Sequence, residues 1–324
     1  MLAIVLLFVP DLIYRIYRYF FPSPNIRPDG KHVLITGCDS GFGHALAIEL
    51  DRDGYHVFAG VFSASSEHTL RERLSSRATV FPLDITRQED IDAAFELVKG
   101  TTNTLHALVN NAGISTSGYI DWMTMESMRQ VMDVNFFGQV AMTKTFLPLL
   151  IAKRDSRVIN LCSVAGIVTS PMKSAYSASK YALESFSDCL RREMAVWGLR
   201  VSIIEPGPMK TPIIAGHEKF MNQFWNGLSD EARARWGEDF LRVQTKKLSE
   251  NFLYRHAEDP NKVVRALRHA VINSKPEIRY RPGWQSKFVF LPLSMAPAWL
   301  TDIVVSGTIN SAVQPAAVRK LHPE

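Results

Sequence analysis

A tyrosine and a lysine four residues apart, Tyr176 and Lys180, are the most informative pair in this chain. On a helix, residues at this spacing share one face, so the phenol and the ammonium can act together. A free phenol titrates near pKa ~10, too high for a base at neutral pH. A fixed positive charge nearby favours the phenolate and lowers that pKa. The pair therefore predicts proton transfer through Tyr176, although such pairs also occur on solvated helices.

A glycine-rich segment, TGCDSGFG at residues 36–43, supports this chemistry. It follows a short apolar stretch at 33–35 and opens a helix predicted over 42–50. Glycines at such a turn let a pyrophosphate approach the backbone at the positive end of the helix. The spacing G-x-x-x-G-x-G, set in strand, turn and helix, predicts a dinucleotide-binding site.

Apolar strands and helices alternate through most of the chain. Strands are predicted at residues 33–35, 57–61, 79–83, 105–109, 158–161, 201–204 and 278–280. Helices are predicted between them at 42–50, 67–74, 89–98, 127–134, 138–151, 174–197 and 259–270. Continuous apolar strands joined by helices indicate a parallel sheet covered on both faces. The fold class is therefore α/β, a doubly wound (Rossmann) sheet in a single domain.

Further segments surround this domain, which is placed at 31–285. Residues 22–30 have the prolines and glycine of a linker, and 207–257, rich in Met, Trp and charge, are predicted to form a helical insert. Residues 286–324 form an apolar C-terminal extension, and its stretch at 288–305 is interrupted by Pro292 and Pro297. This tail is expected either to pack over the site or to touch a membrane.

The first 21 residues are expected to anchor the protein in a membrane. As a helix they would be about 31 Å long, close to the thickness of a hydrocarbon core. A cleaved signal peptide fits poorly, because the basic start and the small-x-small cleavage site are missing. Tyr14, Tyr17 and Tyr19 suit a membrane interface. Pro10 and Asp11 interrupt the segment, so spanning the bilayer and lying flat on it both remain open.

The composition of the chain limits the kinds of partner that it is expected to bind. The 324 residues are 46% hydrophobic and 21% charged, with a net charge of +5. No basic stripe interleaved with aromatics is present, so nucleic acid is not expected, and the charge favours anionic lipid surfaces. Three cysteines without a CxxC predict neither a disulfide framework nor a metal site, and Cys38 is expected to be a small filler in the turn.

Several motifs in order resemble the short-chain dehydrogenase/reductase family over residues 31–285. The glycine turn matches its T-G-x-x-x-G-x-G, Asn110-Asn111-Ala112-Gly113 its N-N-A-G, and Pro206-Gly207 its P-G. The positions of its catalytic tetrad hold Asn135, Ser163, Tyr176 and Lys180. Residues 37–43 and the run Arg279-Tyr280-Arg281-Pro282-Gly283-Trp284 are similar to the microsomal retinol dehydrogenases and the 3α- and 17β-hydroxysteroid dehydrogenases.

The resemblance implies a role for each matching residue. Tyr176 would be the general acid and base, Lys180 would lower its pKa and hold the nicotinamide ribose, and Ser163 would bind the substrate oxygen. Asn135 would hold a helix bend and a water. The resemblance places these residues, with Tyr176 and Lys180, around the cofactor: Thr36, Gly37, Ser40, Gly41, Phe42, Gly43, Asp84, Asn111, Ala112, Gly113, Pro206 and Gly207. For Asp84, which would hold the adenine, a helix cap is an equal alternative.

The sequence says less about whether the cofactor is NAD or NADP. An acid at the end of the second strand would bind the ribose 2′-hydroxyl of NAD, and a basic residue there would suit NADP. That segment is Gly60-Val61-Phe62-Ser63, which has neither. We expect NAD, with NADP left open.

The leading hypothesis is a membrane-associated dehydrogenase of a lipophilic alcohol or ketone, retinoid or hydroxysteroid, in the endoplasmic reticulum. Whether it forms a homo-oligomer is left open. One alternative is a 3-hydroxybutyrate-type dehydrogenase, for which the mitochondrial inner membrane is the alternative location and Lys210 and Arg242 the candidate carboxylate ligands. Another is a non-catalytic cofactor-binding scaffold. Large apolar residues of the insert are expected either to line the substrate site or to pack helix on sheet: Phe220, Met221, Phe224, Trp225, Trp236, Phe240 and Phe252.

Overall fold

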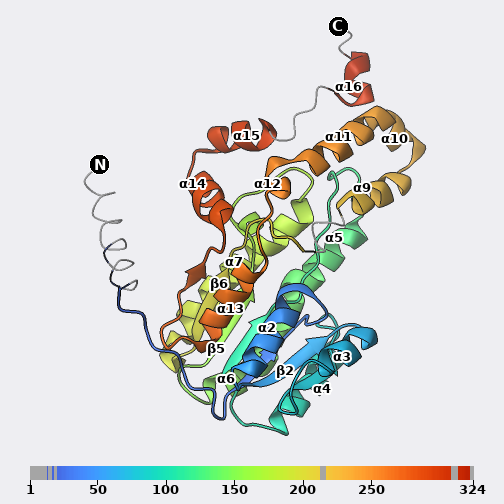
Figure 1. The fold of residues 1–324 in the computed structure, drawn as a ribbon. Helices are drawn as coiled ribbons and strands as arrows, with labels where there is room; N and C mark the ends of the chain where they lie inside the picture. The colour runs from blue at the N-terminus through green and yellow to red at the C-terminus, as the bar shows by residue number, and fades with distance from the viewer. Residues whose placement is uncertain (1–12, 14–16, 18–19, 212–216, 308–312, 322–324) are drawn as a thin grey trace.

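A computed structural model shows seven parallel strands in one sheet, in the order β3-β2-β1-β4-β5-β6-β7 (Figure 1). The structure describes residues 13, 17, 20–211, 217–307 and 313–321. The strands are β1 His32–Ile35, β2 His56–Val61, β3 Thr79–Pro82, β4 Ala107–Asn110, β5 Arg157–Leu161, β6 Arg200–Ile204 and β7 Arg279–Tyr280. The predicted α/β doubly wound fold is confirmed.

The strand order reverses beside β1, which pairs with β2 on one side and β4 on the other. Ligands of doubly wound sheets bind outside the carboxyl ends of the strands at such a switch point. Ile35, the last residue of β1, is in register with Ala59 of β2 and Val109 of β4. The loops that follow β1 and β4 therefore emerge side by side.

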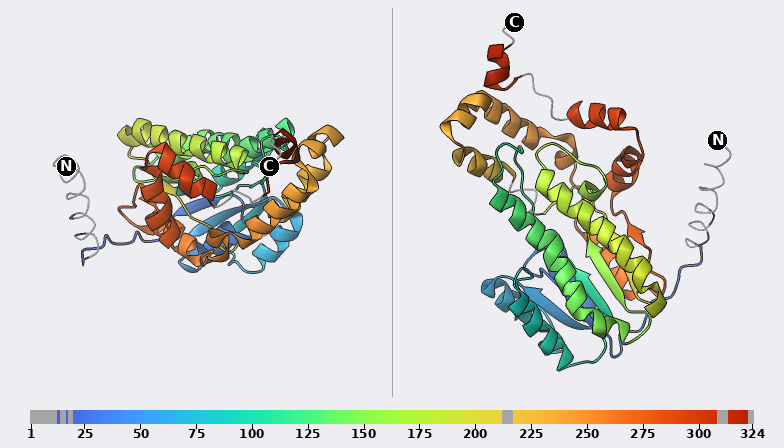
Figure 2. Two further views of the ribbon diagram at one scale, coloured as in Figure 1. Left: turned by 90° about the horizontal axis from the view of Figure 1, so that it is seen from above. Right: turned by 180° about the vertical axis from the view of Figure 1, so that it is seen from behind.

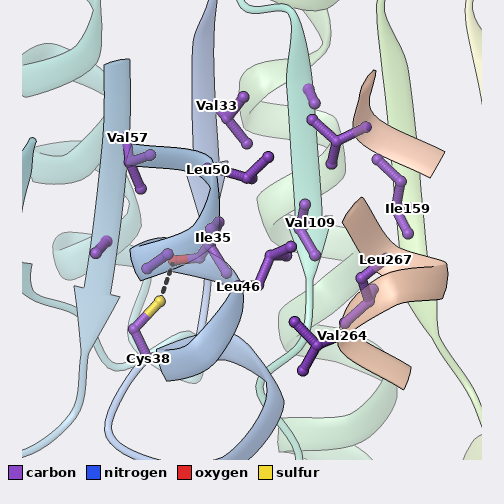
Figure 3. Close-up of a cluster of buried hydrophobic side chains, with 14 of the residues drawn as sticks. Val33, Ile35, Cys38, Leu46, Leu50, Val57, Val109, Ile159, Val264 and Leu267 are labelled. Carbon is purple, nitrogen blue, oxygen red and sulfur yellow. Dashed lines mark hydrogen bonds between the residues drawn. The ribbon is translucent and has the colours of Figure 1, made fainter. Parts of the chain in front are cut away.

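Helices cover both faces of the sheet because the strands are apolar on both sides. One face packs against α2 (Gly41–Arg52), α3 (Ala64–Arg71) and α13 (Asn261–Ile272). Figure 3 shows this core, in which Leu46 and Leu50 of α2 meet Val33 and Val109 of the strands. The other face packs against α4 (Gln88–Lys99), α6 (Gln139–Ile151) and α7 (Ser174–Glu193).

Two predicted helices, at 127–134 and 138–151, are one continuous helical segment. In it, α5 (Met125–Met132) passes through a π turn, η1 (Asp133–Gly138), into α6. At Gly138 a Cβ atom would come within 2.6 Å of the Ile85 carbonyl oxygen, so glycine lets this turn press against the loop after β3. Among the described helices, this segment alone is long and apolar enough to cross a membrane. It also carries Asn135, whose side chain is buried within the domain.

The insert and the tail are helical and lie beyond the carboxyl ends of the strands (Figures 1 and 2). The insert contains α9 His217–Asn226, α10 Asp230–Trp236, α11 Glu238–Glu250 and α12 Phe252–Arg255. The tail contains η4 Ser286–Phe290, α14 Leu291–Ser294, α15 Ala298–Gly307 and α16 Ala316–Leu321. Most of the expected anchor, residues 1–21, lies outside the described residues. The described side chains of this segment that are large, apolar and exposed are Ile13, Tyr17, Phe20 and Phe21.

Candidate active site

A cavity of about 1190 Å³ lies at the carboxyl ends of the strands, between the glycine turn and the insert. Most of the residues predicted from the sequence line it: Gly37, Ser40, Gly41, Phe42, Asp84, Asn111, Ala112, Gly113, Ser163, Tyr176, Lys180, Pro206 and Gly207. The other three, Thr36, Gly43 and Asn135, lie behind this wall and contact the residues that form it.

The glycine turn has the backbone conformation that its sequence requires. Gly37 and Gly41 have φ angles of +70° and +64°, which residues with a Cβ rarely adopt. A Cβ at Gly41 would meet nothing within 4 Å, so this point of the turn faces open space. Cys38 is buried beside the turn and its thiol donates to the Ile35 carbonyl. Burial raises the pKa of this thiol far above its usual range, consistent with a filler.

Side-chain hydrogen bonds fix the turn to the end of β4. The Thr36 hydroxyl accepts from the backbone N–H groups of Asn111 (3.1 Å) and Ala112 (3.0 Å). The Asn111 side-chain amide donates to the carbonyls of Thr36 and Gly37, each at 2.9 Å. A Cβ at Gly43 would collide with this amide and with the Gly37 carbonyl oxygen. The two loops at the switch point therefore form one closely packed unit.

Ser163, Tyr176 and Lys180 converge on the same cavity from β5 and α7. Ser163 follows β5 by two residues, and its hydroxyl accepts from the Ala165 N–H at 3.1 Å. Tyr176 is half-buried on the first turn of α7. Lys180 lies one turn later with its ammonium 5.8 Å from the centre of the Tyr176 ring. Its Nζ donates to the Leu161 carbonyl at 2.8 Å, which holds the ammonium under the tyrosine.

Burial dominates the electrostatics of this group. It raises the pKa of Tyr176 to about 12, and the hydrogen bond with the Ser163 side chain only partly opposes it. Burial also lowers the pKa of Lys180. The sequence-based expectation that the lysine brings the phenol toward neutrality is therefore not met in this state. The main reason is the burial of Tyr176 itself; Lys180 is desolvated as well and donates to a backbone carbonyl.

Asn135 lies on the π turn η1 and is fully buried. Its side chain pairs with the backbone of Ile114, accepting from the N–H and donating to the C=O, both at 2.8 Å. Its amide also donates to Ser179 on α7 at 3.0 Å. Asn135 thus connects the helix bend, the segment after the N-N-A-G motif and helix α7.

Asp84 lines the cavity and also stabilises a turn. Its carboxylate accepts from the Thr86 N–H at 2.9 Å and from the Thr86 hydroxyl at 2.7 Å. The residue that directly precedes α4 is Arg87, so the alternative of a helix cap at Asp84 is wrong.

Comparison with known proteins gives the family. Residues 31–222 match the family model described as short chain dehydrogenase. The chain belongs to the short-chain dehydrogenase family. It is 40% identical over 278 residues to retinol dehydrogenase 16 of Rattus norvegicus, covering 84% of this chain and 86% of the relative. It is 37% identical over 306 residues to short-chain dehydrogenase/reductase family 9C member 7 of Bos taurus, covering 92% and 96%.

Solved structures agree with this assignment. A short-chain dehydrogenase from Streptomyces avermitilis is 27% identical, with a TM-score of 0.67 over 87% of this chain and 98% of its own. The protein therefore belongs to the retinol dehydrogenase branch of its family and is a dehydrogenase acting on CH–OH groups. The alternative of a non-catalytic scaffold is not supported.

The substrate end of this short-chain dehydrogenase contains residues that the sequence did not single out. Its apolar lining comes from the loop after β5, the insert and the tail: Val164, Val168, Met172, Met209, Leu248, Leu253, Tyr254 and Phe290. Lys173, Gln244 and Lys247 add polar groups. Lys173, three residues before Tyr176, donates to the Ser117 hydroxyl at 2.7 Å, and burial lowers its pKa to about 7. Because Lys173 is only three residues from Tyr176, its place in the cavity could have been predicted from the sequence.

The large apolar residues proposed for substrate contact lie elsewhere. Met221, Phe224, Trp225 and Phe240 are buried together against Trp122, with Phe220 and Trp236 at the edge of the same cluster. Phe252 is 60% exposed. None of these seven is among the described residues that line the cavity. Six of them pack among helices and the loop at Trp122 and not against the sheet, and Phe252 is largely exposed.

Proposed function

We propose that this dehydrogenase transfers hydride between NAD(H) and a lipophilic alcohol or ketone, with Tyr176 as general acid and base. The observation that carries the proposal is the shared cavity. Ser163, Tyr176 and Lys180 line it between the glycine turn on one side and a mainly apolar wall on the other.

The residues present fit a bound dinucleotide. The open space above Gly41, at the amino end of the twelve-residue helix α2, suits a pyrophosphate. Asn111, Ala112 and Gly113 would hold the nucleoside from β4, and Pro206 and Gly207 would close the nicotinamide end. When bound, the nicotinamide supplies the hydride acceptor or donor.

The side chains then divide the proton chemistry among them. Ser163 would donate a hydrogen bond to the substrate oxygen and stabilise charge that develops on it. Tyr176 would accept the hydroxyl proton during oxidation and return it during reduction. Lys180 would stabilise the phenolate that oxidation requires, because its ammonium lies one helical turn away. Asn135 would position the loop after β4 and the catalytic helix.

The walls of the substrate end favour a large apolar substrate. A buried methylene contributes about 0.8 kcal/mol, so a retinoid or steroid gains more from this wall than a four-carbon acid. One observation favours the second candidate, a short hydroxy acid: Lys173 and Lys247 both line the cavity and could face a carboxylate. Lys210 and Arg242, proposed for this role from the sequence, are not among the described residues that line it.

Substrate competition distinguishes these candidates. Purified full-length protein would be assayed for NAD reduction with retinols, 3α- and 17β-hydroxysteroids and 3-hydroxybutyrate. We expect the highest kcat/KM for one of the lipophilic alcohols. A kcat/KM for 3-hydroxybutyrate above that for every retinol and steroid would contradict the proposal and favour the second candidate.

We also propose that the protein works at a membrane, in the endoplasmic reticulum. The exposed apolar side chains of Tyr17 and Phe20, near the start of the chain, and of Trp299 and Ile303 on α15 support this. Deletion of residues 1–21 should reduce sedimentation with microsomes, with partial binding retained through the tail. Full-length protein found entirely in the soluble fraction would contradict the proposal.

A further inference from the structure

We propose that Asp39 makes this enzyme select NAD(H) over NADP(H). The inference rests on the proposed dinucleotide site but not on the identity of the alcohol. Asp39 lies in the glycine turn, lines the cavity and has no role in the chemistry described above.

The Asp39 carboxylate reaches the end of β2. One of its oxygens accepts from the Ser63 N–H at 2.8 Å, and the other accepts from the Phe62 N–H at 2.9 Å. A backbone hydrogen bond from Cys38 to the Gly60 carbonyl, 2.9 Å, holds the turn against the same strand. Both oxygens of the carboxylate are therefore held by hydrogen bonds, and Asp39 is half-buried.

This position is the one where nucleotide choice is made in doubly wound folds. An acid at the end of the second strand binds the ribose 2′-hydroxyl, and a cation there accommodates a 2′-phosphate. Here β2 ends at Val61, and neither it nor the following Phe62 and Ser63 supplies an acid or a cation. Asp39 brings a carboxylate to this place from the glycine turn after β1, so the acid comes from a different segment of the chain.

The hydrogen bonds of Asp39 to Phe62 and Ser63 also oppose binding of a 2′-phosphate in a second way. Two backbone N–H groups next to the start of α3, at Phe62 and Ser63, could bind a phosphate oxygen, but they already donate to Asp39. The described lining residues of the glycine turn, the end of β2 and the start of α3 include no cation. Nearby Arg71 donates to Glu67 at 2.7 Å, and Arg73 contacts His44 at 3.0 Å. A 2′-phosphate would thus meet a fixed like charge without a compensating partner.

Binding of the two reduced cofactors tests this directly. Dissociation constants for NADH and NADPH would be measured by calorimetry on the full-length protein without an alcohol. We expect wild-type protein to bind NADH at least about tenfold more tightly than NADPH, and Asp39→Asn to shift this ratio at least about tenfold toward NADPH. Asp39→Glu, which keeps the charge, should retain the preference. Glu72→Gln, which removes an equal charge from an exposed position just beyond α3, should leave the ratio unchanged.

A second variant keeps the test decisive if Asp39→Asn does not fold. Ser63→Lys leaves the turn intact, because the Ser63 hydroxyl contacts only the exposed Ser65 among the described residues. The added ammonium beside Asp39 should shift the ratio toward NADPH. Wild-type protein that binds NADPH as tightly as NADH would overturn the inference, as would an unchanged ratio in both variants. Failure to oxidise any lipophilic alcohol would contradict the proposed function instead, because these affinities do not depend on turnover.

Discussion

The cofactor end and the substrate end of the cavity are held in place by different kinds of interaction. At the cofactor end, short polar contacts join Thr36, Gly37 and Asn111, and glycines allow the loops to touch. At the substrate end, the insert packs against Trp122 through large side chains such as Phe240. The tail packs through Phe290 against the loop after β5. The first arrangement fixes atoms to within a hydrogen-bond length, whereas the second fills volume with packed apolar side chains.

This difference matches the demands of the two ligands. A dinucleotide presents the same atoms in every turnover, so its binding site can be built from backbone groups at fixed positions. An alcohol of variable shape needs walls whose side chains can be exchanged without loss of the fold. Ser163, Tyr176 and Lys180, the proposed catalytic residues, line the cavity where the two ends meet.

Tyr176→Phe should produce the largest effect, because it removes the proton carrier at this meeting point. We expect kcat to fall by about 10²- to 10⁴-fold, with NADH affinity nearly unchanged. Tyr181→Phe is a matched control, since Tyr181 is 42% exposed on the same helix. Steady-state kinetics and calorimetry on the same preparations give both values. A Tyr176→Phe enzyme with near-normal kcat would show that another group moves the proton.

Phe240→Ala should separate stability from cofactor binding. Phe240 is 5% exposed within the aromatic cluster, and loss of such a ring costs about 3–5 kcal/mol of unfolding free energy. Chemical denaturation followed by tryptophan fluorescence measures this loss. NADH affinity of the folded fraction should change little, because Phe240 itself is not among the described residues that line the cavity. A loss of NADH affinity as large as the loss of stability would show that the two ends are not independent.

Gly43→Ala addresses the opposite end. The new methyl group would collide with the Asn111 amide and the Gly37 carbonyl, which should cost about 1–3 kcal/mol and lower NADH affinity at least about tenfold. Gly227→Ala is the control in the insert, where the nearest atom to the new methyl lies at 3.5 Å. Calorimetric NADH binding that is equal in both variants would refute the close packing described for the switch point.

Leu248→Ala should give the smallest effect, confined to substrate preference. Leu248 lines the cavity from α11, and loss of its apolar contact should lower kcat/KM for the best lipophilic alcohol about fivefold, near 1 kcal/mol. Leu241→Ala is the control: both leucines of this helix pack against the aromatic cluster, but only Leu248 also lines the cavity. Kinetics with one retinol and one short alcohol would compare them. An equal loss for both substrates would assign Leu248 a structural role only.

The same contrast explains what the sequence could predict. Strands, helices and the glycine turn depend on local patterns, so the sheet and the residues at its switch point were predicted from the sequence. The break expected between residues 134 and 138 is a π turn. Several predicted bounds are also shifted: α3 spans 64–71 and not 67–74, and Leu105 precedes its strand.

The substrate end could not be predicted in this way, because its lining comes from separate elements. Lys173 precedes α7, Gln244 lies on α11, Tyr254 on α12 and Phe290 on η4. The insert's large aromatic residues suggested substrate contact by type, but they pack against Trp122, whose nearness has no signal in a single sequence. The contact of Asp39 with Phe62 and Ser63 is equally hidden, since it joins the ends of two different strands.

The pH dependence of alcohol oxidation tests the central claim, that the substrate proton passes through Tyr176, most directly. Burial raises the pKa of this phenol to about 12, so only a small fraction is the phenolate base at neutral pH. Below the pKa, the phenolate fraction grows tenfold for each unit by which the pH rises. The kcat/KM for oxidation should therefore rise with pH across the neutral and alkaline range. Reduction uses the protonated phenol and should remain flat over the same range. An oxidation kcat/KM that does not change between about pH 6 and 9 would contradict proton transfer through Tyr176.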